Sequence, residues 1–560
     1  MLRENSSLSS PFVTSVADSS FIFSVLVPSN HILRRIKKEV DFNSLYPLVA
    51  SLYTTNSGRP AIPADVVGKL SLLQFMYNLS DRELIEACRQ RIDFKFFLDL
   101  AVESDAPCDA STLSRVRTRW GSEVFEKFFD QTVALANRKG LLGKERIVDS
   151  SKMLMNASVL RSSQLLKRIC DKMLKAIKEH VSSETLSVLS GEMKILTEDT
   201  SWWLSSEAKE KHYYQWATFS QELVATAKSV IDNSNEVTNI KAVSIYLALL
   251  NKHLDDRAVE EKLKALAKKK RQKNEESSGG DTPTKQSGNA AMCAKHPSGI
   301  RKDKLVSDVD PDARQAADRK KKVRAGYKVH VSMDSKSEII TAVHTTPMNC
   351  DDGPHLPELM RKERAANQSE VTQVAADTAY CDGPVREKLQ EMGITAFIPE
   401  PAVKPSKANK YTTSDFNYDS QTNTIICPAN KTCTTNKVRN KTRFFYFTQL
   451  QCANCPLAEK CLPVKGSVTR GRTVSMTIYR SLHEEAKELQ KTDAHKDAMN
   501  RRLAVEHKQG EMLNIHGLRH ARYRGLSKGS LQVFMTASVT NLKRIIRLLD
   551  KQAIQLSEST

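Results

Sequence analysis

Long hydrophobic runs are missing from this sequence of 560 residues. The longest apolar stretch near its start, from Phe21 to Val27, is far shorter than the roughly 20 residues that a membrane-spanning helix needs. Neither a basic segment nor a cleavage site of small residues surrounds it, so a secretory signal is not indicated. We therefore expect a cytoplasmic protein with no membrane partner.

A regular cysteine framework is also missing. The eleven cysteines are an odd number, and most are scattered singly along the chain. Small secreted domains that depend on disulfides have denser, even sets. A disulfide scaffold is therefore not expected.

Positive charge is what the chain has in excess. It carries 85 lysines and arginines against 65 aspartates and glutamates, a net charge of +20. Such an excess favours a polyanionic partner, and nucleic acid is the first candidate because phosphate neutralisation drives its binding. A solvated basic surface, a ribosome-like protein and a membrane-surface binder are the alternatives. The length exceeds what one core of roughly 250–300 residues fills, so several domains are expected.

One apolar stretch ends in a carboxylate. Residues 371–376 are apolar and β-branched enough for a buried strand, Asp377 follows, and Pro384 is typical of the first turn of a helix. Ligands of α/β sheets collect beyond the carboxyl ends of strands. A helix-capping or turn role for Asp377 is the alternative, because caps and turns recruit aspartate often.

Two further stretches supply acids of the same kind. After Arg146, the apolar residues Ile147 and Val148 form a short run that ends at Asp149, and residues 501–511 are typical of a helix that carries Glu506. Two aspartates and a glutamate suit Mg²⁺ or Mn²⁺, which prefer oxygen ligands. Two such metals can stabilise the attacking and leaving oxygens of phosphoryl transfer.

These stretches resemble the motifs of DDE-type transposases of bacterial insertion sequences, in the group with an InsH-like helical amino-terminal domain. The matching motifs are Ile147-Val148-Asp149-Ser150-Ser151, Ala376-Asp377-Thr378-Ala379-Tyr380, Arg502-x-x-x-Glu506 and His516-Gly517-Leu518-Arg519-His520-Ala521-Arg522-Tyr523-Arg524-Gly525. The resemblance implies that Asp149, Asp377 and Glu506 are catalytic and bind two Mg²⁺ (or Mn²⁺) ions.

The resemblance also implies contacts with double-stranded DNA, at transposon ends and at the target. The candidates are Arg502, Lys508, Arg519, Arg522, Tyr523 and Arg524. In one respect the chain departs from the family, whose signature would place a lysine where this chain has Leu513. Lys508, on the same helix, is the candidate replacement.

An α/β fold is implied, with an RNase H-like mixed sheet as catalytic core after an all-helical amino-terminal domain. In that fold the first acid lies on the first strand, the second at the end of the fourth and the third on a late helix. Separations of 228 residues from Asp149 to Asp377 and 129 from Asp377 to Glu506 require a helical insertion and a small cysteine-rich insertion.

Helix signals dominate the first part of the chain. Residues 41–52 have helical apolar spacing, Pro63 opens a largely apolar helix, and Ser80 with Glu83 forms a capping box. This segment resembles the family's amino-terminal domain, which implies DNA-end binding or dimer contacts, and a homodimer is expected. A helical packing domain without such a role is the alternative.

The helical insertion contains aromatic residues that stack on bases or fill a core, and core is the commoner role. They are Trp202, Trp203, Tyr213, Tyr214 and Trp216. Residues 268–273 form a dense cationic run before a polar linker, and we favour a phosphate contact for them over a solvated helix end. Beyond the linker, residues 327–333 alternate as a half-exposed strand does.

The second insertion gathers five cysteines between residues 427 and 461. Cys452 and Cys455 have the C-x₂-C spacing of thiolate ligands for tetrahedral Zn²⁺. Because related transposases look similar there, Cys427, Cys452, Cys455 and Cys461 are the preferred set for a structural zinc. Reduced cysteines without a metal, or a redox pair, are the alternatives.

The expected division of the chain follows these signals. It comprises a flexible terminus (1–26), a helical domain (27–142), the first core strand (143–157), the helical insertion (158–273), a linker (274–300), the rest of the core (301–399), the cysteine-rich insertion (400–480) and the carboxy-terminal helices with Glu506 (481–560). The expected function is metal-dependent cleavage of transposon ends and strand transfer. An RNase H-like nuclease without strand transfer and a non-catalytic, transposase-derived DNA-binding protein are the alternatives.

Overall fold

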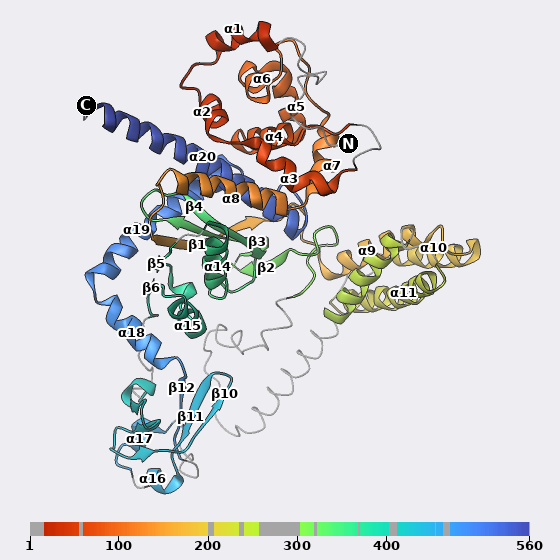
Figure 1. Ribbon diagram of the computed structural model, residues 1–560. Coiled ribbons are helices and arrows are strands. Elements are labelled where there is room, and N and C mark those ends of the chain that lie inside the picture. Colours follow the sequence, from red (N-terminus) through yellow and green to blue (C-terminus); the bar gives the residue numbers. More distant parts are fainter. Residues whose placement is uncertain are drawn as a thin grey trace.

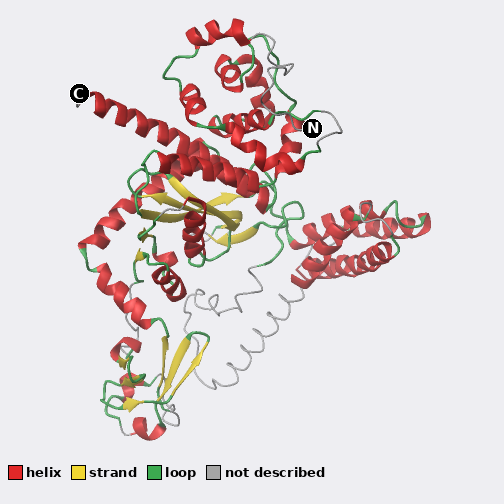
Figure 2. Cartoon of the chain, in the orientation of Figure 1, coloured by secondary structure: helices red, strands yellow, loops and turns green. Residues whose placement is uncertain are grey.

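The computed structural model describes residues 16–54, 60–199, 206–234, 240–256, 303–317, 322–367, 370–401, 411–453, 455–462 and 471–558. A mixed sheet lies at the centre, with a helical region on one side of it (Figure 1). A helical arm and a small β-rich module project away from it (Figure 2). The predicted α/β class is confirmed.

The central sheet contains six strands, in the order β2-β3-β1-β5-β6, with β4 also paired to β3. They are β1 (Glu145–Leu154), β2 (Arg314–Ala317), β3 (Val323–Asp334), β4 (Ile340–Pro347), β5 (Gln373–Ala375) and β6 (Thr395–Phe397). Strands β1, β3 and β4 pair antiparallel, whereas β1, β5 and β6 pair parallel. Asp149 lies on β1, the first strand, and Asp377 follows β5, which is the fourth strand of the sheet in chain order when the short edge strand β2 is left aside.

Strand β1 continues past the apolar run that ends at Asp149, as far as Leu154 and within the predicted bounds 143–157, because β3 pairs with it along nearly its whole length. One strand prediction is wrong in detail. Strand β3 is not half-exposed, since both of its faces are buried from Ala325 to Met333 apart from Lys328. One face packs on the long helix α20 and the other on α14. The polar side chains of the alternating stretch, His330 and Ser332, are therefore buried as well.

Helices cover the sheet. They are α14 (His355–Asn367), α15 (Gly383–Glu391), α18 (Arg480–Gln490), α19 (Asp493–Gly510) and α20 (Leu526–Glu558). Helix α20 crosses the sheet (Figure 1), and its Asn541 side chain donates to the Ile340 carbonyl and accepts from the Ile340 N–H. A π-helical turn, Glu511–Ile515, follows α19.

The helical region comprises α1 (Val16–Leu26), α2 (Ile32–Glu39), α4 (Ala64–Met76), α5 (Asp81–Gln90), α6 (Ile92–Leu98), α7 (Ala110–Trp120) and α8 (Glu123–Arg138). The capping box of Ser80 and Glu83 is confirmed, and so is the buried helix after Pro63. The helical region shares a single apolar cluster with the sheet and α20, which extends in sequence from Leu33 to Ile546.

Two predictions for the helical region need correction. Helix α1 begins at Val16, inside the terminus expected to be flexible up to residue 26. The single helix expected over residues 41–52 is three short pieces, η1 (Phe42–Leu45), α3 (Tyr46–Val49) and η2 (Ala50–Leu52). Proline at the start of α3 lacks the N–H that would continue the preceding turn as an α-helix.

The arm consists of α9 (Ser162–Ile177), α10 (Ser183–Glu198), α11 (Ser206–Asp232) and the helical residues 241–256, packed on a core of their own. Tyr213 and Trp216 are buried in that core, as the packing interpretation predicted, whereas Tyr214 is exposed. Trp202, Trp203, the cationic run 268–273 and the linker 274–300 lie outside the described residues.

The cysteine-rich insertion is a β-rich module with two three-stranded sheets. The strands are β7 (Asn417–Asp419), β8 (Thr424–Ile426), β9 (Thr432–Cys433), β10 (Asn436–Arg439), β11 (Thr442–Tyr446) and β12 (Thr473–Thr477), and two short helices, α16 (Gln449–Ala453) and α17 (Ala458–Cys461), lie beside them. Among the described helices of the whole chain, none has the length and apolar character to span a membrane.

Candidate functional site

The two aspartates emerge side by side from neighbouring parallel strands. Ile147 of β1 pairs with Ala375 of β5, and Asp149 and Asp377 each lie two residues beyond that pair. Neighbouring strands run about 4.8 Å apart, so register alone brings both carboxylates to the same edge. Asp377 also caps the short turn η5 (Thr378–Tyr380), accepting the Ala379 N–H through Oδ1 at 3.0 Å. It therefore fills the capping role considered above, and it lies at the strand end as predicted.

Glu506 approaches from α19, and Arg502 links it to Asp149. The two Arg502 Nη atoms lie 3.4 Å from Asp149 Oδ2 and 3.3 Å from Glu506 Oε1. Helix α19 is held on β1 by Val505, which packs with Ile147 and Met333. The Glu506 side chain is 57% exposed, whereas that of Asp149 is 16% exposed. One acid is thus open to a ligand while another is fixed in the sheet.

The three acids influence one another electrostatically. Burial is the largest cause that raises the pKa of Asp149, to about 6, and the negative charges of Asp377 and Glu506 raise it further. The Ser150 N–H, which donates to Asp149 Oδ1, and the Arg502 guanidinium act in the opposite direction. A divalent cation would relieve this crowding of like charge, and three carboxylates are the oxygen donors that Mg²⁺ and Mn²⁺ prefer. The donor set therefore fits the expected metals, although Arg502 stands between two of its members.

A polar pair that the sequence interpretation missed lies behind the acids. The Tyr380 hydroxyl is 3.4 Å from Nδ1 of His330, whose Nε2 is 3.1 Å from Oγ1 of Thr346. Burial, with help from the charge of His355 and then Lys328, lowers the pKa of His330 to about 2, so this ring is neutral. Tyr380 lies three residues after Asp377, within the same motif, and this position is the sequence signal that could have revealed the pair. Nothing in the sequence pattern singles out His330.

The structure separates the predicted DNA contacts into two groups. Arg519 and Arg524 are exposed and each makes a local hydrogen bond, to Asn514 and to the Asn156 carbonyl. They remain surface candidates, as does Arg502 within the site. The others are used inside the protein.

Lys508 is buried, with Nζ 2.9 Å from Glu511 and 3.9 Å from Glu338. It follows Glu506 by two positions, roughly 200° around an α-helix. It therefore points away from the acids, and the structure does not support it as a replacement for the family lysine. Leu513 itself packs against the main core.

Arg522 and Tyr523 join the carboxy-terminal segment to the helical region. The Arg522 guanidinium donates to the Leu79 carbonyl and the Asn78 side chain. The Tyr523 ring lies 5.0 Å below the guanidinium of Arg117. The expectation that these two side chains contact DNA is not supported, because tertiary contacts within the protein occupy both of them.

The preferred cysteine set lines one small cavity. Cys427, Cys452, Cys455 and Cys461 surround a volume of about 20 Å³, which suffices for one water-sized occupant. The Lys431 and Arg472 N–H groups point at the sulfurs of Cys427 and Cys452, at 3.3 and 3.5 Å. Such N–H contacts support thiolate ligands. Cys433, the fifth cysteine, lies apart, with its sulfur near backbone carbonyls.

Two family models match this chain. Residues 21–119 match a transposase domain, DUF772, and residues 426–546 match a transposase DDE domain. The chain matches a DDE-type insertion-sequence transposase. The transposase DDE match includes Glu506 and all five cysteines of the cysteine-rich module, whereas Asp149 and Asp377 precede it. The other transposase match spans the helical region from α1 to α7. No curated protein and no solved structure matches the chain.

Proposed function

We propose that this chain cuts DNA at the ends of an insertion sequence and joins the freed ends to target DNA. Transposases act on DNA, and DDE-type members generally use divalent metal ions. The observation that carries the proposal is the arrangement around Asp149, in a chain of net charge +20: Asp377 lies at the end of the neighbouring strand, and Arg502 links Asp149 to Glu506.

Asp149, Asp377 and Glu506 would hold two Mg²⁺ (or Mn²⁺) ions. Such ions, when bound, lower the pKa of an attacking water or 3′-hydroxyl and stabilise charge on the leaving oxygen. No covalent enzyme intermediate is needed, so no nucleophilic serine or tyrosine is required.

The side chains of the site have distinct tasks. The sheet fixes Asp149, and the η5 turn fixes Asp377 through its cap, so these two acids define a rigid edge. Glu506, more exposed and carried by a helix, completes the set from the solvent side. Arg502 neutralises Asp149 and Glu506, and its planar guanidinium also suits a phosphate oxygen pair. The Arg502 guanidinium is placed to give up one of its ion pairs with these carboxylates and bind a phosphate of the DNA backbone instead.

The decisive experiment compares Glu506→Gln with the wild-type chain on end-labelled DNA that carries the element's own termini, with and without Mg²⁺. Glutamine keeps the size of the side chain and removes one negative charge. Cleavage should fall by at least roughly 10²-fold, the scale of removing one group that stabilises a transition state, while DNA binding persists. Asp497→Asn, an exposed acid on the same helix, is the matched control and should cut normally.

The products separate the three functions. Cleaved ends joined to target DNA support transposition, and cleaved ends without joined products indicate a nuclease. Binding without metal-dependent cleavage by the wild-type chain indicates the DNA-binding alternative. A Glu506→Gln variant that cuts as fast as the wild type would refute the assigned role.

A further inference from the structure

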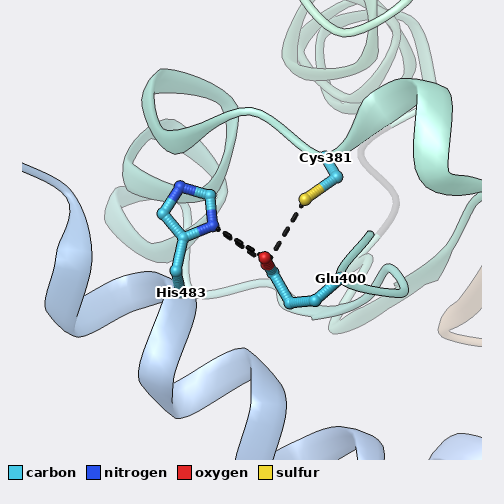
Figure 3. Close-up of side chains that lie close together, drawn as sticks. All are labelled: Cys381, Glu400 and His483. Atoms are coloured by element: carbon cyan, nitrogen blue, oxygen red, sulfur yellow. Dashed lines mark hydrogen bonds and ion pairs between the residues drawn. The ribbon is translucent and has the colours of Figure 1, made fainter. Parts of the chain in front are cut away.

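A second group of metal-ligating side chains lies outside the acid site. Cys381, Glu400 and His483 each offer one donor atom, and these atoms all lie within 4.8 Å of one another (Figure 3). Among the residues that the structure describes, this is the closest-set group of three such side chains. We propose that these three side chains bind a zinc ion.

The donor distances are near those of a zinc site. Cys381 Sγ lies 3.3 Å from Glu400 Oε1, and His483 Nδ1 lies 3.0 and 3.1 Å from the two Glu400 oxygens. Ligands at 2.0–2.3 Å from a tetrahedral zinc are separated by roughly 3.3–3.8 Å. Small side-chain rotations are therefore enough to open the group around an ion.

The ligand types select the metal. A thiolate, an imidazole and a carboxylate suit zinc, whereas Mg²⁺ prefers oxygen ligands alone. The fourth position of a tetrahedron would be left to water. His483 is 22% exposed and Glu400 is 9% exposed, so an ion can enter from solvent.

Arg386 shapes the charge balance of the group. Its Nη2 donates to Oε1 of Glu400 at 2.8 Å and lies 3.7 Å from Cys381 Sγ. It also donates to the Ile398 carbonyl, which anchors it to the core. The guanidinium thus orients Glu400 and partly offsets the burial that raises the pKa of the Cys381 thiol. With zinc, the thiolate, the carboxylate and Arg386 sum to one positive charge, so we expect weaker binding than at the four-cysteine set.

The three ligands come from separate elements. Cys381 follows the η5 turn that begins after Asp377, Glu400 lies beyond β6, and His483 belongs to α18. Helix α18 connects the cysteine-rich module to α19, the helix of Glu506. A zinc ion would therefore fasten this connection to the core, next to the strand end that carries Asp377.

The test measures zinc binding by the full chain, without DNA, by competition with a chromophoric chelator. Excess Mg²⁺ masks the carboxylates of the acid site. His483→Gln is the main variant, because glutamine can still donate an N–H to Glu400 but is a poor zinc ligand. It should bind one zinc equivalent fewer than the wild type. Cys350→Ala, outside both cysteine groups, should bind as many as the wild type.

A second variant guards against a folding defect. Cys381→Ser should lose the same single equivalent, and the metal-free thermal unfolding midpoint reports whether each variant is folded. Zinc should raise this midpoint more in the wild type than in His483→Gln. Equal zinc stoichiometry in the wild type, His483→Gln and Cys381→Ser would overturn the proposal and leave a hydrogen-bonded cluster. Because no cleavage is measured, this result is independent of the proposed function.

Discussion

Replacing Arg146 with methionine should destabilise the sheet that carries the acids. Arg146 is fully buried on β1, three residues before Asp149. Its Nε lies 2.5 Å from Glu363 of α14, and its Nη1 lies 3.0 Å from Asp334 at the end of β3. One guanidinium thus ties β1 to a neighbouring strand and to a helix on one face of the sheet.

The magnitude follows from what the substitution leaves behind. Asp334 keeps the N–H groups of Gly143 and Ser337, and Glu363 keeps the hydroxyls of Ser332 and Thr341 but loses the cation that faces it. Removing one partner of a buried ion pair costs about 3–5 kcal/mol. For a cooperative core of this size, the unfolding midpoint should fall by on the order of 10 °C.

Thermal unfolding followed by circular dichroism measures this shift, and a double variant provides the control. Arg146→Met combined with Glu363→Leu removes the Glu363 carboxylate, which has lost its charged partner. Ser332 and Thr341 can still form a hydrogen bond with each other, since their hydroxyls are 3.2 Å apart. The double variant should therefore recover at least half of the loss, because apolar replacements of buried ion pairs are often neutral. A double variant as unstable as the sum of the two single ones would refute this reasoning.

Three further predictions address single features. Arg522→Ala should lower the unfolding midpoint and leave the salt dependence of DNA binding unchanged. Arg524→Ala should reduce the slope of that salt dependence by about one. Equal slopes in both variants would contradict the view that Arg524 contacts DNA and Arg522 does not. The unfolded His330 ring takes up a proton near pH 6.5 and the folded one only near 2, so stability is lost as the pH falls below 6.5, by about 2 kcal/mol at pH 5. His330→Gln should show a correspondingly weaker fall of the unfolding midpoint between pH 7 and pH 5. An unchanged fall would show that His330 is not the source of this pH dependence. Cys452→Ser should release one zinc equivalent to a chelator, whereas Cys433→Ala should retain it; retention by both would argue against the four-cysteine set.

Local signals predicted much of the fold. Ser80 and Glu83 specify a helix start by their own hydrogen bonds, and the structure has that capping box. The apolar runs before Asp149 and Asp377 likewise indicated strands, because burial depends on composition over a few residues. The apolar run alone does not show how far β1 extends, because residues 150–152 stay in the strand through pairing with β3, which is distant in sequence.

The candidate site shows the same division. The helix period places Arg502 beside Glu506, so this pair follows from sequence spacing alone. Asp149 and Asp377 meet through the register of β1 with β5, which are distant in sequence, and only the family resemblance implied that meeting. Whether a basic side chain faces solvent or another part of the protein depends on tertiary contacts, so the sequence could not show that Arg522 contacts Leu79 and Asn78. The group of Cys381, Glu400 and His483 draws on three separate elements and has no spacing that a sequence pattern could reveal.

The single apolar cluster that unites the helical region, the sheet and α20 has a mechanical consequence. Two parts with a common interior cannot hinge against each other without exposing it. DNA bound by the helical region would therefore lie at a fixed distance from the three acids. The arm packs mainly on an interior of its own, so this distance does not depend on the length of the arm.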